Sequence, residues 1–273
     1  MSRVESITRP DGPPISLLAP GVELRILATG SLGARGVTTS LATFHAAAEL
    51  TYHRHPFSEV IVVLEGEAFV SIEGRRYRTG PYDAMHVPAG AAHAVRNASD
   101  GCRAVLHSSF ASENPTREMA TDIFHAEDRD ASDNNCPESL LRFQAAPVYE
   151  LSPGAHFRDL FAKRFGSRGI CGGYGLFGPG ASLPCHYHEY DESITIIQGS
   201  AVCQVAGREY ELADCGTACI PKGRPHRFLN RSHVPMAMIW VYAGNEPERT
   251  LVHAGFCDGS QPIDALACGP HEP

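Results

Sequence analysis

The sequence lacks the features that mark nucleic-acid-binding and membrane-spanning proteins. Its 31 Asp and Glu residues outnumber its 23 Lys and Arg residues, and no basic run or face is evident. This balance argues against nucleic acid or an anionic membrane as a partner. No apolar run of about eighteen residues is present, so the sequence predicts no membrane-spanning helix. A small molecule is the expected partner.

Two further absences concern the cellular location. The first twenty residues contain no basic-then-apolar leader. The nine cysteines are an odd number without a paired framework, which favours free thiols in a reducing compartment over a disulfide scaffold. Both observations predict a cytoplasmic protein.

One pattern that is present, His-x-His-x(3)-Glu-x(6)-Gly, occurs twice. Its two copies begin at His53 and His186, which lie 133 residues apart. A second pattern, Pro-x-Gly-x(2)-His-x(3)-Asn, also occurs twice with the same offset, beginning at Pro88 and Pro221. Because the register holds through both patterns, we predict that the chain is one domain, duplicated.

The spacing of the first pattern suits a metal site. On an extended strand, His53 and His55 point to the same face about 6 to 7 Å apart, as two imidazoles that bind one ion require. On a straight strand Glu59 would lie roughly 13 Å from His55, too far to share that ion. The chain must therefore turn back within residues 56–58, and the apolar run 60–64 is the candidate for the neighbouring strand.

These patterns resemble the two motifs of the cupin family, and both halves of the chain match every named position. The resemblance covers roughly residues 35–110 and 168–243. It implies an all-β bicupin with two double-stranded β-helix (jelly-roll) barrels, each holding an ion between three His and one Glu. The metal ligands that it implies are His53, His55, Glu59 and His93 in the first half, and His186, His188, Glu192 and His226 in the second.

The strand signals predict one barrel before and one barrel after the segment 111–165, which has few strand signals. Residues 1–110 are predicted to form the N-terminal barrel, with motifs at 53–66 and 80–97. Residues 166–273 are predicted to form the C-terminal barrel, with motifs at 180–199 and 216–230.

Residues 111–165 read as the interdomain linker. They include helix formers at 116–120, an acidic stretch at 127–133 and a further possible helix at 138–144. We predict one or two short helices and an exposed polar loop.

The ligand set limits the metal and its chemistry. Three imidazoles and a carboxylate suit Fe, Mn, Ni, Cu, Co or Zn and are poor ligands for calcium or magnesium. We predict up to two such divalent ions per chain. Four protein ligands leave two positions of an octahedral shell open for substrate, and Glu59 or Glu192 can serve as a general base if it leaves the metal.

The motifs do not choose among the reactions that the resemblance offers. We favour a dioxygenase-type oxidoreductase acting on a small chelating substrate, because the ligand set is complete and the expected pocket residues Phe57, Tyr190, Val95 and Phe228 are apolar or aromatic. One alternative is a non-oxidative decarboxylase or isomerase of a small oxo-acid or sugar acid. An inward-facing Arg would favour it, and the sequence places none inside. Another alternative is a binding or sensing protein without turnover. A homodimer paired through sheet edges is also expected from the resemblance.

Overall fold

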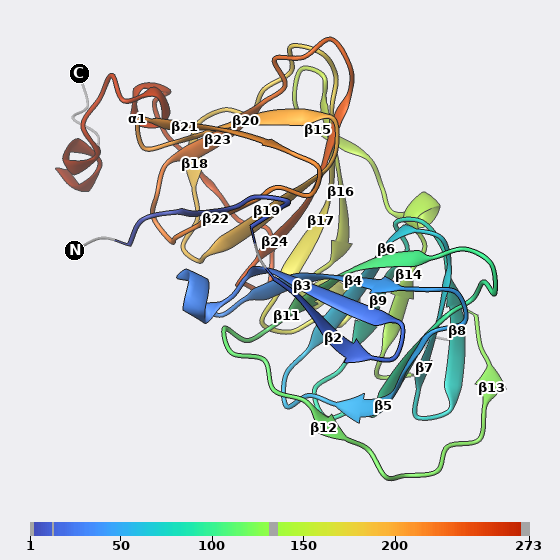
Figure 1. Cartoon of the computed structure of the whole chain (residues 1–273). Coiled ribbons are helices and arrows are strands. Elements are labelled where there is room, and N and C mark those ends of the chain that lie inside the picture. Colours follow the sequence, from blue (N-terminus) through green and yellow to red (C-terminus); the bar gives the residue numbers. More distant parts are fainter. Residues whose placement is uncertain (1–2, 13, 131–135, 269–273) are drawn as a thin grey trace.

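Two β-barrels, joined through one face of each, make up most of the chain (Figure 1). This computed structural model describes residues 3–12, 14–130 and 136–268. Each barrel consists of two sheets that curve around their own apolar core, and their strands pair antiparallel except for β13 with β8. The all-β fold with two jelly-roll barrels is therefore confirmed.

The first barrel is built from strands between residues 15 and 141. In spatial order, its larger sheet contains β14 (Ser139–Leu141), β9 (Ala84–Val87), β6 (Glu59–Glu65), β11 (Ala104–Phe110), β4 (Thr38–Phe44), β3 (Val22–Ala28) and β2 (Ile15–Ala19). Its second sheet contains β12 (Glu118–Met119), β5 (Glu49–Arg54), β10 (His93–Asn97), β7 (Ala68–Ile72), β8 (Arg75–Thr79) and β13 (Glu127–Asp128).

The second barrel repeats this arrangement. Its larger sheet contains β1 (Ser6–Thr8), β22 (Thr217–Ile220), β19 (Glu192–Gln198), β24 (Met236–Tyr242), β17 (Cys171–Phe177), β16 (Ala155–Phe161) and β15 (Tyr149–Ser152). Its second sheet contains β21 (Arg208–Ala213), β20 (Ser200–Val205), β23 (His226–Leu229), β18 (His186–Tyr187) and β25 (Thr250–Leu251). A short helix, α1 (Gly255–Asp258), and 3-10 turns at Gly30–Leu32, Phe143–Ala145, Lys163–Phe165 and Ile263–Cys268 complete the described elements.

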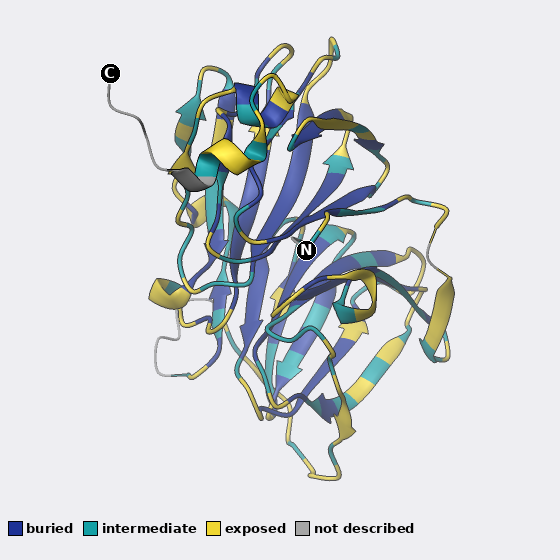
Figure 2. Cartoon of the chain, turned by 90° about the vertical axis from the view of Figure 1, so that its left-hand side faces the viewer, coloured by how far each residue is buried: buried dark blue, intermediate teal, exposed yellow. Residues whose placement is uncertain are grey.

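Strand β6 shows why the two barrels adhere. A sheet that is buried on one face has alternating apolar and polar residues, whereas β6 is an unbroken run of apolar residues after Glu59. Ile61 and Val63 point into the first barrel, while Val60 and Val62 pack in a separate core between the barrels. The larger sheets of the two barrels are thus buried on both faces (Figure 2).

The core between the barrels also contains polar side chains. Thr39 Oγ1 and Ser193 Oγ, one from each barrel, lie 2.8 Å apart in a hydrogen bond. His107 Nε2 lies 3.4 Å from Thr195 Oγ1 of the other barrel, and the imidazole is fully buried. Such paired groups orient the barrels, because buried polar groups are costly unless a partner is present.

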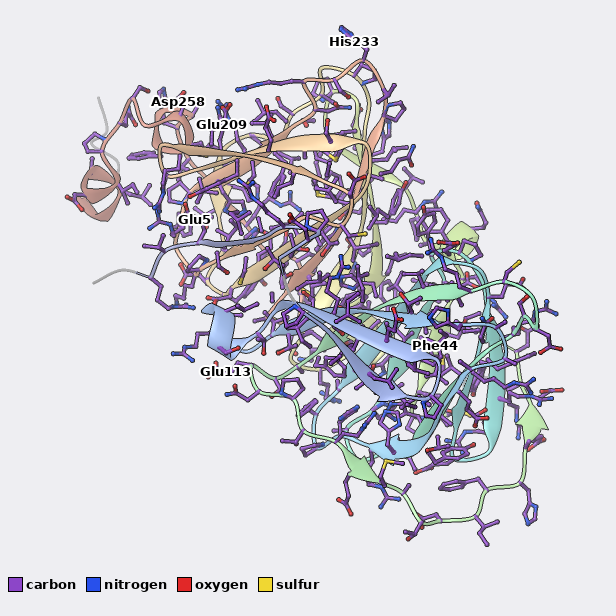
Figure 3. The ribbon with its side chains drawn as sticks, viewed as in Figure 1. Glu5, Phe44, Glu113, Glu209, His233 and Asp258 are labelled. Carbon is purple, nitrogen blue, oxygen red and sulfur yellow. A yellow bond between two sulfur atoms is a disulfide. The ribbon has the colours of Figure 1, made fainter. Side chains whose placement is uncertain are left out.

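The N-terminal segment crosses to the other barrel. Strand β1 pairs with β22, so residues within the predicted N-terminal barrel extend the sheet of the second one. The carboxylate of Glu5, labelled in Figure 3, is fully buried among the second barrel's strands. It accepts hydrogen bonds from Arg208 at 2.8 Å and Tyr210 at 2.9 Å, and Arg224 Nε lies 2.9 Å away.

The connecting segment differs in part from its prediction. The short helices are the 3-10 turns Phe143–Ala145 and Lys163–Phe165. Residues 116–120 form no helix, because Glu118–Met119 pairs as β12 with β5. Strands β15 and β16 belong to the second barrel's sheet. The described part of the acidic stretch, 127–130, is largely exposed, and residues 131–133 of it lie outside the described residues. In the described chain, no helix has the length and hydropathy needed to cross a membrane.

Replacing Glu5 should destabilise the protein strongly. Glu5→Ala leaves the buried guanidinium of Arg224 without its carboxylate, and breaking a buried ion pair costs about 3–5 kcal/mol. Glu67→Ala is the control, because the Glu67–Arg78 pair is exposed and such pairs contribute about 0–1 kcal/mol. Urea unfolding measures both losses, and equal losses would contradict a special role of Glu5.

His107 should make the protein sensitive to acid. Burial lowers the pKa of His107 to about 4. A lowered pKa means that the neutral ring contributes its stability above the unfolded-state pKa of about 6.5 and loses it as the pH falls toward 4, by about 3 kcal/mol in all. His107→Gln should therefore lose less free energy of unfolding between pH 7 and pH 4.5 than the wild type, whereas the exposed His45→Gln should not differ from the wild type.

Candidate metal centres

The four motif residues of the first barrel meet where its two sheets come together. His53 lies in β5 opposite His93, the first residue of β10, and His55 follows the end of β5. Glu59 is the first residue of β6, in the other sheet, so the chain does turn back between His55 and Glu59. The four side chains are buried, and one nitrogen or oxygen atom of each lies within 4.8 Å of the others.

The second barrel forms the same cluster. His186 of β18 lies opposite His226, the first residue of β23, and Glu192 begins β19 in the other sheet. His188 follows β18, and all four residues are again buried with their atoms within 4.8 Å of one another. The structure thus brings together each of the two predicted sets.

Backbone carbonyl groups orient all six imidazoles. In the first barrel each Nδ1 faces a carbonyl oxygen, that of Thr51 for His53 (2.8 Å), Thr116 for His55 (2.5 Å) and Ala91 for His93 (3.2 Å). The second barrel uses Pro184 for His186 (2.9 Å), Glu248 for His188 (2.6 Å) and Arg224 for His226 (2.9 Å). A carbonyl can only accept, so Nδ1 carries the proton and the Nε2 lone pair points into the cluster, as in metal-binding histidines.

The protonation states also suit a cation. Burial raises the pKa of Glu59, but the facing His55 and His93 rings outweigh it and hold that pKa well below its usual range. In the second barrel, the facing His188 and His226 rings likewise outweigh burial and lower the pKa of Glu192. Burial lowers the pKa of His53 to about 3, so this ring is neutral at ordinary pH.

Unpartnered atoms in the second cluster identify what its residues fit. His188 Nε2, His226 Nε2 and Glu192 Oε2 are buried without a hydrogen-bond partner. His226 Nε2 and Glu192 Oε2 lie 2.7 Å apart but not in hydrogen-bond geometry. Buried polar atoms that converge in this way are costly unless a cation binds them. Three imidazoles and a carboxylate fit a divalent transition metal.

A family comparison matches both barrels. The model of the cupin domain matches residues 40–110 and 173–242, which is more than half of the chain. The chain belongs to the cupin family. With two such domains and a cluster of three His and one Glu in each, it is a bicupin.

The relatives of this bicupin include proteins of different activity. A tetracenomycin polyketide synthase protein of Streptomyces glaucescens is 30% identical over 93 residues, which span 34% of this chain and 60% of that relative. The oxalate decarboxylase of Bacillus subtilis superposes with a TM-score of 0.74 at 16% identity, over 90% of this chain and 78% of that one. A formate complex of the Lactobacillus farciminis oxalate decarboxylase reaches 0.76 at 14% identity, over 100% and 95%. At these identities the solved structures show a shared fold, and the Bacillus subtilis enzyme has Mn(II) centres.

The first cupin barrel has an open cavity beside its cluster. The cavity has a volume of about 200 Å³, and His53, His55, Glu59 and His93 form one end of it. Its wall is mainly apolar and includes the predicted Val95, while the ring of Phe57 stacks on His55 with centroids 5.4 Å apart.

The same space in the second barrel is filled by aromatic side chains. Trp240, in β24, is 2% exposed and lies in the apolar core with Phe157 and Phe228. A Cβ atom added to Gly173 would lie only 2.7 Å from Trp240 Cζ2, so the glycine makes room for the indole. The glycines of β17 therefore allow neighbouring aromatic side chains to pack closely against the strand.

Arg117 is a site residue that the sequence analysis missed. It lines the mouth of the first cavity, and its side chain has no hydrogen bond or ion pair with the residues that the structure describes. The signal was present: Ala-x(3)-Pro-x-Arg occurs at 111–117 and again at 243–249. The offset there is 132 rather than 133, and the expectation of a helix at 116–120 concealed the repeat. In both barrels this segment supplies the carbonyl that orients the second histidine, from Thr116 and Glu248.

The structure also contradicts the expectation of unpaired cysteines. Cys185, next to His186, forms a disulfide with Cys257 of α1. Nothing in the spacing of the nine cysteines indicated this pair, because the two residues are 72 positions apart and meet only when α1 packs on the second barrel. The cytoplasmic location and the homodimer stay predictions.

Metal analysis should find two ions per chain. His53→Ala/His55→Ala removes two imidazoles from the first cluster, and His186→Ala/His188→Ala does the same in the second. Elemental analysis should show one ion lost from each variant, because each cluster has its own ligands. Loss of both ions from either variant, with the fold intact by circular dichroism, would contradict two independent centres.

Proposed function

We propose that this bicupin is a metal-dependent decarboxylase that acts without oxygen on a small oxo-acid in its first barrel. The observation that carries the proposal is the free guanidinium of Arg117 at the mouth of the cavity that ends at His53, His55, Glu59 and His93. An inward-facing Arg was the feature expected of the decarboxylase alternative; Arg117 borders the cavity but is itself exposed to solvent. The similarity to oxalate decarboxylases supports that alternative better than the dioxygenase first favoured.

Arg117 is suited to bind a substrate carboxylate beside the metal ligands. A guanidinium matches the two oxygens of a carboxylate through paired hydrogen bonds. Burial and, to a smaller extent, the charge of Arg117 lower the pKa of His55, but Glu59 and the carbonyl group of Thr116 outweigh them and raise it overall. A carboxylate at the mouth would therefore lie between Arg117 and the cluster.

Each group has a defined part in the proposed reaction. A divalent metal would be held by His53, His55, Glu59 and His93, and it would supply a Lewis acid that polarises the oxo group. Arg117 orients the carboxylate, and the apolar wall excludes water from it. In a 3-oxo-acid, the bond between the carboxyl carbon and the carbon next to the oxo group breaks, carbon dioxide leaves, and the electron pair passes into the polarised oxo group as an enolate before that carbon takes a proton from water admitted at the mouth.

The two carboxylates of the clusters are better suited as metal ligands than as proton carriers. The pKa values of Glu59 and Glu192 both lie well below the usual range, so neither holds a proton near neutral pH. Their predicted role as general bases would require release from the metal and stays a prediction. Because Trp240 fills the second barrel, we assign turnover to the first barrel and a structural role to the second centre.

Arg117→Ala should reduce carbon dioxide release without loss of metal. A hydrogen bond to a charged group contributes about 1.5–3 kcal/mol, so kcat/KM should fall by about 10- to 150-fold. Arg249→Ala is the matched control, because Arg249 is the counterpart in the second barrel, and it should leave turnover unchanged.

Carbon dioxide should be measured in sealed anaerobic vessels with the metal-loaded protein and a panel of small oxo-acids. Oxygen uptake in step with turnover would instead favour the dioxygenase. Binding of these acids without any turnover would favour the binding or sensing protein. Equal turnover by Arg117→Ala and the wild type would overturn the role given to Arg117.

A further inference from the structure

The wall of the first cavity contains a pair of hydroxyl groups that the proposed reaction does not use. Ser40 of β4 and Ser108 of β11 lie directly opposite each other in the sheet, and both line the cavity. Ser40 is fully buried, and its Oγ has no hydrogen-bond partner. A buried hydroxyl without a partner is costly, and rotation of the Ser40 side chain about χ1 would present it to a ligand group in the cavity.

The sheet register places this pair two residues along the strands from the position of Glu59. Glu59 lies opposite Phe110, and two residues further along the strands Ile61 lies opposite Ser108. Two residues of a strand span about 6.6 Å. Along β6, the residue opposite Ser108 is thus about 6.6 Å from Glu59, a span comparable to one six-membered ring with a substituent.

The remaining wall of the cavity is apolar. Between and below the two polar ends lie side chains that offer no hydrogen bonds, namely Leu18, Leu24, Ile26, Ala42, Phe44 and Leu106. An apolar cavity of about 150 Å³ holds benzene, and pockets for drug-sized ligands have about 300–1,000 Å³. At about 200 Å³, this cavity suits one ring or an equally large branched chain.

The second barrel shows that the fold does not require the two serines. By sheet register, Trp240 stands where the first barrel has Ser108, since each lies two residues before the residue opposite the cluster carboxylate. Gly173 pairs with Trp240 as Ser40 pairs with Ser108. One copy of the duplicated barrel is filled, and the other is left open with hydroxyls on its wall.

We propose that the first barrel selects an oxo-acid whose body is a single ring with a hydrogen-bonding substituent at the end away from the carboxylate. This inference rests on the proposed function only in placing the carboxylate at Arg117. The ring occupies the apolar part of the cavity, and the substituent pairs with Ser40 and Ser108. Oxalate and pyruvate leave both the apolar wall and the hydroxyls without a partner.

Binding to the full-length, metal-loaded chain tests the selection directly. Calorimetry under nitrogen should compare 4-hydroxyphenylpyruvate, phenylpyruvate, pyruvate and oxalate. We expect 4-hydroxyphenylpyruvate to bind at least 50-fold more tightly than pyruvate or oxalate, and about 2- to 10-fold more tightly than phenylpyruvate, as one added hydrogen bond provides. Equal or tighter binding of oxalate would overturn the inference.

Two variants distinguish the contribution of the hydroxyl groups to binding from that of the open cavity. Ser40→Ala should remove the advantage of 4-hydroxyphenylpyruvate over phenylpyruvate. Ser40→Gly/Ser108→Trp copies the second barrel, where Gly173 makes room for Trp240, and should abolish binding of both aryl acids while two metal ions per chain remain. Thr43→Ser, on the same strand as Ser40 but outside this cavity, is the control and should change nothing. Undiminished aryl binding by a folded Ser40→Gly/Ser108→Trp protein would contradict the site.

The outcome also distinguishes this inference from the proposed function. Tight binding of the aryl acids, with no carbon dioxide release from the 3-oxo-acid that carries the same ring, 3-(4-hydroxyphenyl)-3-oxopropanoate, would leave the selection standing and overturn the decarboxylase. Carbon dioxide release from oxalate, without binding of the aryl acids, would overturn the selection and leave the decarboxylase standing.

Discussion

The convergence of three imidazoles and one carboxylate where two sheets meet is the constraint on which each barrel depends. His53 and His93 are cross-strand neighbours in one sheet, but Glu59 comes from the other, so the cluster joins both sheets at one end of the barrel. Every imidazole is fixed from behind by a backbone carbonyl. A cation bound there neutralises the buried carboxylate and occupies the nitrogen lone pairs, which stabilises the end of the barrel.

Duplication has kept this end of the barrel and changed the interior. The two halves have equivalent clusters, and in each half the carbonyl group that orients the second histidine belongs to the residue just before an Arg. They also share an Asn, Asn97 or Asn230, whose side chain donates to three backbone carbonyl groups. The middle of each barrel differs, because Ser108 leaves space that Trp240 fills. A filled interior favours stability and an open one permits binding, and this difference is the basis for assigning turnover to the first barrel.

The barrels are held as a pair by more than their linker. Strands such as β6 are apolar on both faces, β1 crosses to the far barrel, and Glu5 anchors it there among arginines. Arg3 reaches Asp191 in the turn between His188 and Glu192 of the second centre. The N-terminal segment therefore supports the second centre although its sequence precedes the first barrel.

The sequence by itself determined the duplication and the return of each Glu to its two histidines, because strand periodicity and the return to a neighbouring strand depend on local spacing. Its resemblance to the cupin family implied the barrels and the complete set of eight cluster residues. Only the tertiary structure decided the positions of Arg117, Ser40 and Trp240. Whether a side chain faces a cavity depends on sheet pairing and on how neighbouring side chains fill the interior, which spacing along the chain does not reveal. The Cys185–Cys257 disulfide could not be predicted for the same reason, since these residues are far apart in sequence and become neighbours only after the chain packs.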